Sequence, residues 1–383
     1  MKYNFDAPVN RFGTNCVKHD EMPNEDTVAL WVADMDFETA PCVREALRKR
    51  MEHGCFGYTL VPESYYQSVI KWFSSRHGWT IARDSFIYTS GVVPAISAII
   101  KAMTSSGDKV LVQTPVYNCF FSSIRNNGCV LAENPLVYAD NRYTVDFADF
   151  EAKCKDPLVK VFLLCNPHNP AGRVWSSEEL RRMGEICKAN GVFVISDEIH
   201  CEFTNSCRYT PFAVASDADC AVCVSPSKAF NIAGLQIANI IVSDADVRSK
   251  VDKAININEV CDVNPFGVIA LQAAYSDEGA EWLRQLNEYI YANYEFAKSF
   301  IGEHIPQFGV TKLEGTYLLW VDVSSLGKPS DVVADEWLER ANVYVNAGTM
   351  YGDKAGRQFV RINLATQRSV LAEGLNRIKK ALD

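Results

Sequence analysis

The sequence has no long apolar run, and its charge is not predominantly positive. No stretch of about 18 apolar residues occurs, which argues against a membrane-spanning helix. The 38 lysine and arginine residues stand against 47 aspartate and glutamate residues, which leaves a net charge of −9. Because an acidic chain binds nucleic acid and anionic membranes poorly, we expect neither as a partner.

An export signal and a disulfide framework are also missing. Residues 1–8 are polar and lack the apolar stretch of a signal peptide, and the 13 cysteines are scattered along the chain. We therefore expect a cytoplasmic protein with reduced thiols. Cys220 and Cys223 form a lone C-x-x-C pair with no nearby histidine. A buried strand fits this pair better than a redox or metal site, and we expect no metal.

What the sequence does contain is a globular composition and a regular alternation of elements. Its 383 residues, 48% of them hydrophobic, are enough for about two domains. From residue 90 onward, short apolar runs alternate with helix-length segments, which predicts an α/β fold. In such a fold a mainly parallel sheet is covered by helices on both faces, giving three αβα layers. The apolar runs are 110–113, 159–164, 192–196 and 221–224.

The pattern changes after residue 280. A long helix candidate at 280–303, strands at 318–323 and 359–362, and a helix at 368–382 predict a smaller α+β domain. We therefore expect three parts. These are an N-terminal segment of residues 1–45 that packs with the small domain, a large domain of residues 46–280, and a small C-terminal domain of residues 281–383.

Two of the loops that follow predicted strands are rich in glycine, proline and asparagine. Residues 89–94 read TSGVVP and precede a helix expected to begin near Ala95. A glycine before a helix start leaves backbone N–H groups free for a phosphate. Residues 166–172 read NPHNPAG, in which two Asn-Pro pairs fix a rigid loop whose amides suit a ring oxygen. Taken alone, each loop is equally well read as a plain turn.

Two further loops carry charge at the ends of predicted buried strands. Asp197 stands in SDEIH, where a buried carboxylate needs a partner such as a protonated ring nitrogen. Lys228 ends SPSK, and an amine in such a place is able to form a Schiff base. Together the four loops supply phosphate donors, a ring-oxygen ligand, a counter-ion and an imine-forming lysine. Pyridoxal 5′-phosphate requires this set.

With these motifs in place, the sequence resembles the fold-type I pyridoxal-phosphate enzymes, the aspartate aminotransferase superfamily, over nearly its whole length. The order Asn169, Asp197, Lys228, Arg361 is the order of the superfamily. More narrowly, the sequence resembles the carbon–sulfur lyase branch, the MalY/PatB-type cystathionine β-lyases. The resembling segments are ADMDF (33–37), FGY (56–58), SGVVP (90–94), NPHNPAGRVW (166–175), SDEIH (196–200) and SPSKAFNIAGLQ (225–236).

The resemblance implies a role for several residues around the cofactor ring, in the large domain. Lys228 would form the Schiff base and act as general base, and Asp197 would pair with the ring nitrogen. Asn169 would bond the ring hydroxyl oxygen, with His200 sharing that bond. Tyr117 would stack on the ring. The candidate catalytic residues are Lys228, Tyr117 and a second tyrosine, Tyr58.

The resemblance also implies ligands for the phosphate and the substrate. The phosphate would be held by Gly91, Val92, Ser225 and Ser227. Tyr58 would reach the phosphate of the neighbouring subunit, which implies a homodimer with shared active sites. Arg361 would bind the α-carboxylate of an amino-acid substrate through two parallel hydrogen bonds.

The implied reaction is β-elimination from L-cystathionine or a related cysteine S-conjugate, which gives a thiol, pyruvate and ammonia. An aminotransferase is the alternative, because both reactions share every step up to the loss of the Cα proton. A regulatory or binding protein on the same scaffold is a second alternative. His19 and residues 346–352 depart from the branch pattern, so they bear on the choice of substrate more than on the cofactor. Gln236 replaces an arginine found in many aminotransferases, as it does in the lyase branch.

Overall fold

A seven-stranded sheet forms the centre of the computed structural model, which describes residues 3–259 and 262–382. The strand order is β2-β10-β9-β8-β7-β3-β4. β10 runs antiparallel to β2 and β9, and the other neighbouring pairs are parallel. The expected mainly parallel sheet is confirmed. Its strands are β2 (Phe86–Thr89), β3 (Lys109–Val112), β4 (Val130–Glu133), β7 (Val159–Cys165), β8 (Phe193–Asp197), β9 (Cys220–Val224) and β10 (Ala238–Ile241).

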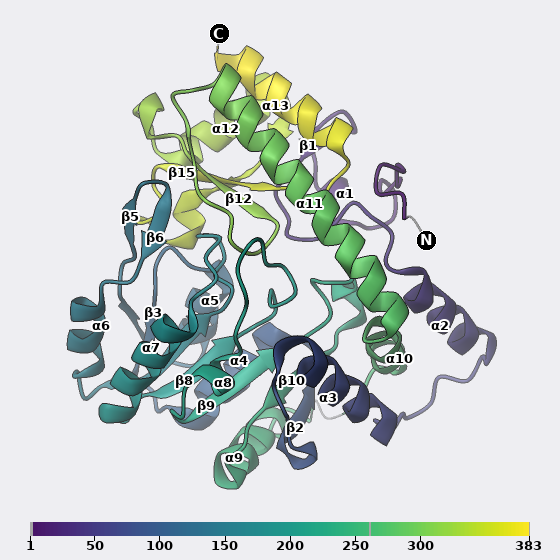
Figure 1. The fold of residues 1–383 in the computed structure, drawn as a ribbon, viewed down its shortest axis with the longest axis vertical. Coiled ribbons are helices and arrows are strands. Elements are labelled where there is room, and N and C mark those ends of the chain that lie inside the picture. Colours follow the sequence, from purple (N-terminus) through teal and green to yellow (C-terminus); the bar gives the residue numbers. More distant parts are fainter. Residues whose placement is uncertain (1–2, 260–261, 383) are drawn as a thin grey trace.

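Helices cover both faces of this sheet (Figure 1). One face packs against α4, α5 and α9 in a single apolar cluster. The opposite face packs against α6, α7 and α8, and toward β9 and β10 against α3 and α10. The three expected layers are therefore confirmed. These helices are α3 (Glu63–His77), α4 (Val92–Met103), α5 (Asn118–Asn126), α6 (Phe147–Cys154), α7 (Ser177–Ala189), α8 (Phe212–Ala215), α9 (Ala245–Asn256) and α10 (Pro265–Ala274).

Local sequence signals explain where several helices begin and end. Ser176 and Glu179 form a capping box at the start of α7. Gly78 ends α3 with a φ of 66°, a left-handed conformation that glycine adopts without steric cost. The helix expected near Ala95 begins earlier, at Val92. Pro94 does not prevent this, because it lies in the first turn, where a backbone N–H has no intrahelical acceptor to lose.

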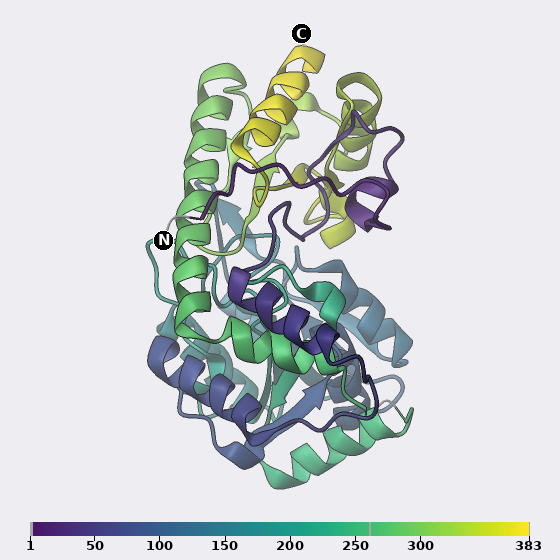
Figure 2. The ribbon, with the colours of Figure 1, turned by 90° about the vertical axis from the view of Figure 1, so that its right-hand side faces the viewer.

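A smaller antiparallel sheet lies beside the large one, in the order β11-β12-β15-β14. The helices α12 and α13 pack with it, and the long α11 runs alongside both parts of the molecule (Figures 1 and 2). These elements are β11 (Gly309–Val310), β12 (Leu318–Asp322), β14 (Asn346–Ala347), β15 (Phe359–Asn363), α11 (Asp277–His304), α12 (Ser330–Ala341) and α13 (Arg368–Leu382). A separate hairpin joins β5 (Val137–Ala139) to β6 (Arg142–Thr144).

The N-terminal segment crosses the upper half of the molecule in Figure 2 before it reaches α2 (Pro41–Glu52). Its strand β1 (Val28–Ala29) pairs in parallel with β13 (Val343–Tyr344), next to the small sheet, and follows the short helix α1 (Val17–Asp20). α2 packs against α10 of the large part. The domain boundaries at residues 45 and 280 stay predictions. Among the described residues, no helix combines the length and apolar character that crossing a membrane requires.

Candidate active site

A cavity of about 420 Å³ opens at the edge of the large sheet where its parallel strands end. Its lining comes from the ends of β2, β3, β7, β8 and β9 and the segments after them, from β15, from residues 346–351, and from residues 31–33 of the N-terminal segment. The topology thus brings together side chains that are far apart in the sequence. The residues named from sequence that line the cavity are Gly91, Val92, Tyr117, Asn169, Asp197, His200, Ser227, Lys228 and Arg361.

Asp197 ends β8 and is buried at the bottom of this edge. One of its oxygens, Oδ1, accepts a hydrogen bond from the Ile199 N–H at 3.1 Å. Burial raises the pKa of Asp197 to about 7; the Ile199 hydrogen bond and the charge of Lys228 oppose this shift, and the charge of Glu198 adds to it. A cation brought into the cavity would favour the carboxylate form. A protonated ring nitrogen is such a cation.

Lys228 follows β9 and is partly exposed to the cavity. Its Nζ donates a hydrogen bond to the Ala33 carbonyl at 2.6 Å. Burial and the positive charge of Arg361 lower the pKa of Lys228 to about 8, against the opposing charges of Asp34 and Asp197. Part of this amine is therefore neutral near pH 7 to 8, and the neutral amine is the form that attacks a carbonyl carbon.

Two buried side chains of the lining have polar atoms without a partner in the described structure. Arg361 donates from Nη2 to the Trp31 carbonyl at 2.7 Å and from Nη1 to Asn169 Oδ1 at 3.3 Å, while its Nε is unpaired. His200 Nδ1 is also unpaired, and burial lowers the pKa of His200, so its ring is neutral. Because unpaired buried polar atoms are costly, they indicate a polar ligand. The residues present fit pyridoxal phosphate and an amino-acid carboxylate.

The N-terminus of α4 supplies the expected anion position. Residues 90–94 line the cavity, and the first turn of α4 has no side-chain cap on its backbone N–H groups. These free N–H groups and the helix dipole favour a phosphate. Ser227 lines the same cavity. Ser225 does not: its hydroxyl donates to the Ile237 carbonyl at 2.5 Å, accepts from the Ser227 N–H at 3.1 Å and lies 2.9 Å from the Ser227 hydroxyl, so it shapes the turn.

The two candidate tyrosines lie in different places. Tyr117 precedes α5 and lines the cavity, where burial raises its pKa and keeps the phenol protonated. Tyr58 lies outside the cavity, in the loop between α2 and α3, and 96% of it is exposed. A single subunit therefore does not bring Tyr58 to the other candidates.

Sequence reasoning missed several lining residues. Trp31, Val32 and Ala33 stand at or just before the ADMDF segment, for which no role was inferred. Residues 346–352 were noted as unusual, and three of them line the cavity. His19 is not part of the lining and instead bonds Asp36 at 3.0 Å. The cavity residues without a predicted role include Trp31, Val32, Ala33, Cys119, Asn346, Met350 and Tyr351.

A lysine amine and a buried carboxylate that share one cavity at this sheet edge fit a fold-type I pyridoxal-phosphate protein. The chain belongs to the aminotransferase class I and II family, whose model matches residues 25–378. The resemblance inferred from the sequence is thereby confirmed.

Known relatives match the chain over its full length. Cystathionine β-lyase PatB of Bacillus subtilis is 41% identical, and the match covers 99% of this chain and 100% of PatB. The crystal structure of cystalysin from Treponema denticola, which contains a pyridoxal 5′-phosphate cofactor, matches with a TM-score of 0.96 and 35% identity. That match covers 100% of this chain and 99% of cystalysin. A PLP-bound putative aminotransferase from Clostridium difficile 630 matches with a TM-score of 0.96 and 39% identity, over 100% of both chains.

Proposed function

We propose that this protein is a pyridoxal-phosphate-dependent carbon–sulfur β-lyase. Its substrate would be L-cystathionine or a related cysteine S-conjugate, and its products a thiol, pyruvate and ammonia. The observation that carries this proposal is the full-length similarity to cystathionine β-lyase PatB. The cavity supports it, because one enclosure holds a reactive amine, a buried carboxylate and an arginine with an unpaired nitrogen.

Several residues of the cavity would hold the cofactor. Asp197 would pair with the ring nitrogen, Asn169 and His200 would bond the ring hydroxyl oxygen, and Tyr117 would lie against the ring. The first turn of α4, at Gly91 and Val92, and the Ser227 hydroxyl would hold the phosphate, with Ser225 supporting the turn. Bound pyridoxal phosphate supplies an electron sink for the electron pair that Cα retains when it loses its proton.

The protein residues do the binding and the proton transfers. Arg361 would bind the substrate carboxylate with its guanidinium and so fix the orientation of Cα. Lys228 Nζ, with its lowered pKa, would take the Cα proton as general base. The sulfur that leaves Cβ would accept a proton from Lys228 Nζ or from a tyrosine hydroxyl, for which Tyr117 and Tyr58 are the candidates.

An aminotransferase is the second candidate function. It is favoured by the family model and by the Clostridium difficile neighbour, which is described as a putative aminotransferase. Arg361 and Lys228 would act in the same way in both reactions. The difference lies in whether the proton returns to the cofactor or a group leaves from Cβ.

We also propose a homodimer with shared sites, located in the cytoplasm. The loop that carries Tyr58 exposes Phe56, Tyr58 and Leu60, with 53%, 96% and 88% of each residue accessible. Exposed apolar side chains gathered in one loop are typical of an interaction surface. A dimer would bring Tyr58 to the site of the partner subunit. The twelve described cysteines are all free, which supports a reducing location, while Cys261 lies outside the described residues.

The test is to mix the purified holoenzyme with L-cystathionine in the absence of any keto acid. The visible spectrum, pyruvate and free thiol are followed together. Continuous release of equal amounts of pyruvate and thiol supports the lyase. A single loss of the cofactor colour with keto acid but no thiol would instead support the aminotransferase. A protein without turnover whose biological effect survives Lys228→Ala would point to a regulatory or binding role.

A further inference from the structure

Residues 31–36 are here called the wall; the first three line the cavity, and several backbone carbonyls of the segment accept hydrogen bonds from other parts of the chain. The Trp31 carbonyl accepts from Arg361 Nη2 at 2.7 Å, and the Ala33 carbonyl accepts from Lys228 Nζ at 2.6 Å. Asn363 Nδ2 donates to the carbonyls of Val32 and Asp34, each at 2.6 Å. The position of the wall therefore determines where two of the proposed functional side chains point.

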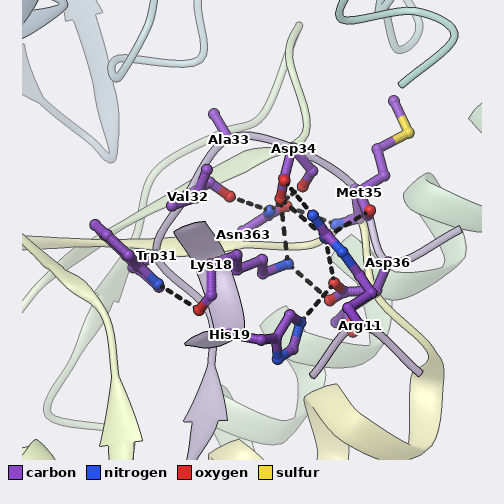
Figure 3. A network of polar contacts seen from close by, with 12 residues as sticks. Arg11, Lys18, His19, Trp31, Val32, Ala33, Asp34, Met35, Asp36 and Asn363 are labelled. Carbon is purple, nitrogen blue, oxygen red and sulfur yellow. Dashed lines mark hydrogen bonds and ion pairs between the residues drawn. The ribbon is translucent and has the colours of Figure 1, made fainter. Parts of the chain in front are cut away.

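The far end of the wall is held by a charged cluster, here called the clasp, which consists of Arg11, Lys18, His19, Asp34 and Asp36 (Figure 3). Lys18 Nζ lies 2.7 Å from Asp36 Oδ2, and His19 Nε2 lies 3.0 Å from Asp36 Oδ1. Arg11 binds both carboxylates, Asp34 at 2.5 Å and Asp36 at 2.9 Å. All three basic residues come from residues 11–19, so the clasp ties the chain before the wall to the wall itself.

The Lys18–Asp36 pair is the buried part of the clasp. Lys18 is 0% exposed and Asp36 is 4% exposed. Burial by itself would raise the pKa of Asp36, but the charge of Lys18 and the hydrogen bond from His19 hold that pKa well below its usual range. Removing Asp36 leaves the buried Lys18 ammonium with only Asp34, 3.9 Å away, whereas removing Lys18 leaves Asp36 with Arg11 and His19.

The clasp also touches the wall at its cavity end. Trp31 Nε1 donates to the Lys18 carbonyl at 3.0 Å, so the helix that carries Lys18 contacts both ends of the wall (Figure 3). The Trp31 carbonyl occupies one guanidinium nitrogen of Arg361, and Asn169 occupies another, which leaves Nε unpaired. A displaced wall would turn the guanidinium away from this orientation.

We propose that Lys18 and Asp36 are positioning residues for the substrate-carboxylate site: by fixing the wall, they hold the Trp31 carbonyl on Arg361. This proposal rests on the proposed function, in which Arg361 binds the carboxylate of an amino acid. The clasp does not touch the substrate. It acts on the affinity for the carboxylate group, because small displacements of a binding group cost affinity and orientation.

The experiment compares Lys18→Met, Asp36→Asn and the double variant with the wild-type holoenzyme. The probe is L-alanine, which has a carboxylate but no leaving group at Cβ, and its binding is followed by the visible absorption of the bound cofactor. We expect each single variant to bind L-alanine about tenfold more weakly and to raise the KM for L-cystathionine similarly, with kcat within about twofold. The double variant should be no weaker than the weaker single variant, because it leaves no buried charge without its partner.

The matched control is Lys109→Met. Lys109 pairs with Asp156 at 2.6 Å, but it begins β3, at the sheet edge opposite the cavity. We expect this control to bind L-alanine as the wild type does. Clasp variants that melt at a lower temperature yet bind L-alanine as the control does would overturn the proposal, because the pair would then be structural only.

Two measurements separate this proposal from the proposed function. If the wild type binds L-alanine but releases no thiol from L-cystathionine, the proposed lyase function is wrong. The affinity of the clasp variants for L-alanine still tests the positioning role. Amide hydrogen exchange of the apoprotein tests the wall without any ligand, and it applies to whichever clasp variant folds. We expect faster exchange in residues 31–36, with unchanged exchange in β8. Unchanged exchange in the wall would contradict the proposal.

Discussion

Lys228 is the residue on which the proposed chemistry depends most directly. Its amine has a lowered pKa and its hydrogen bond to the Ala33 carbonyl holds it in the cavity. We expect Lys228→Ala to lower kcat for L-cystathionine by about a thousandfold or more, because both the nucleophile and the general base are lost. Borohydride treatment followed by mass spectrometry should attach the cofactor to the wild type and not to the variant.

The matched control for this substitution is Lys188→Ala. Lys188 lies on the surface and pairs with Asp217, at 2.6 Å. Its loss should leave kcat unchanged. Retention of most of the activity in Lys228→Ala would exclude this lysine from the reaction.

Asp197 gives the apoprotein a specific dependence of stability on pH. The pKa of Asp197 in the folded state is about 7, above its value of about 3.9 in an unfolded chain. The unfolded chain therefore releases this proton first, and the contribution of Asp197 to stability falls as pH rises from about 4 to about 7. We expect Asp197→Asn to stabilise the apoprotein relative to the wild type at pH 8 and not at pH 4.

Thermal or urea unfolding of the two apoproteins across this pH range is the measurement. The holoenzyme should behave differently, since a protonated ring nitrogen beside Asp197 would favour the carboxylate. An apoprotein difference that is the same at pH 4 and pH 8 would show that the carboxyl group is not buried as described.

At the residue scale, the sequence indicated which side chains belong to the candidate site, but not which backbone carbonyl groups contact them. Asn169, Asp197 and Lys228 lie at or just after the carboxyl ends of buried strands, where ligands bind in sheets of this kind. The carbonyl oxygens of Trp31 and Ala33 carry no such signature, since every residue has a carbonyl group. Their role depends on chain path, which the three-dimensional structure provides.

At the scale of single elements, the turn after β9 separates two serines that look equivalent in the sequence. Ser227 lines the cavity, whereas the Ser225 hydroxyl is used within the turn. We expect Ser227→Ala to weaken pyridoxal-phosphate binding about tenfold, because the hydroxyl that faces the cavity is lost. Ser225→Ala should instead lower the stability of the apoprotein by about 1 kcal/mol, because it removes hydrogen bonds of a buried turn.

Cofactor titration and thermal denaturation of the two variants measure these effects side by side. Each serine variant serves as the control for the other. Equal effects of both substitutions on cofactor affinity would contradict the different roles assigned to the two hydroxyl groups.

The larger elements were predictable because their patterns are local. α3 and α7 have their stop and start signals within a few residues of their ends, at Gly78 and Ser176. β1 and β13 are each two residues long and pair across more than three hundred positions of the chain. A strand of two residues has no periodicity to detect, so this pairing could not be predicted from the sequence.

At the scale of the whole molecule, each active site of the proposed dimer would combine Lys228 of one subunit with Tyr58 of the other. Tyr58→Ala and Lys228→Ala should each be inactive or nearly so when alone. Unfolding and refolding an equal mixture should produce mixed dimers in which one of the two sites is intact. We expect recovery of about one quarter of the wild-type activity.

The activity of the refolded mixture and the mass of the particle in solution are the measurements. Refolding each variant separately is the control and should restore nothing. A monomeric particle, or a mixture no more active than its components, would contradict a shared site.

The way the wall is attached has a consequence for how the protein is made. During translation, residues 11–36 leave the ribosome long before β15, and Trp31 and Arg361 are 330 positions apart. The large sheet has all its strands once residue 241 has emerged, so the edge that would hold a phosphate and a ring is complete early. The site for the substrate carboxylate is still incomplete at that stage, because Arg361 lies in β15. A nascent or truncated chain that ends before β15 would therefore contain the residues that hold the cofactor but lack the arginine that binds the substrate carboxylate. Reactivity toward amino acids would then begin only when synthesis is nearly finished.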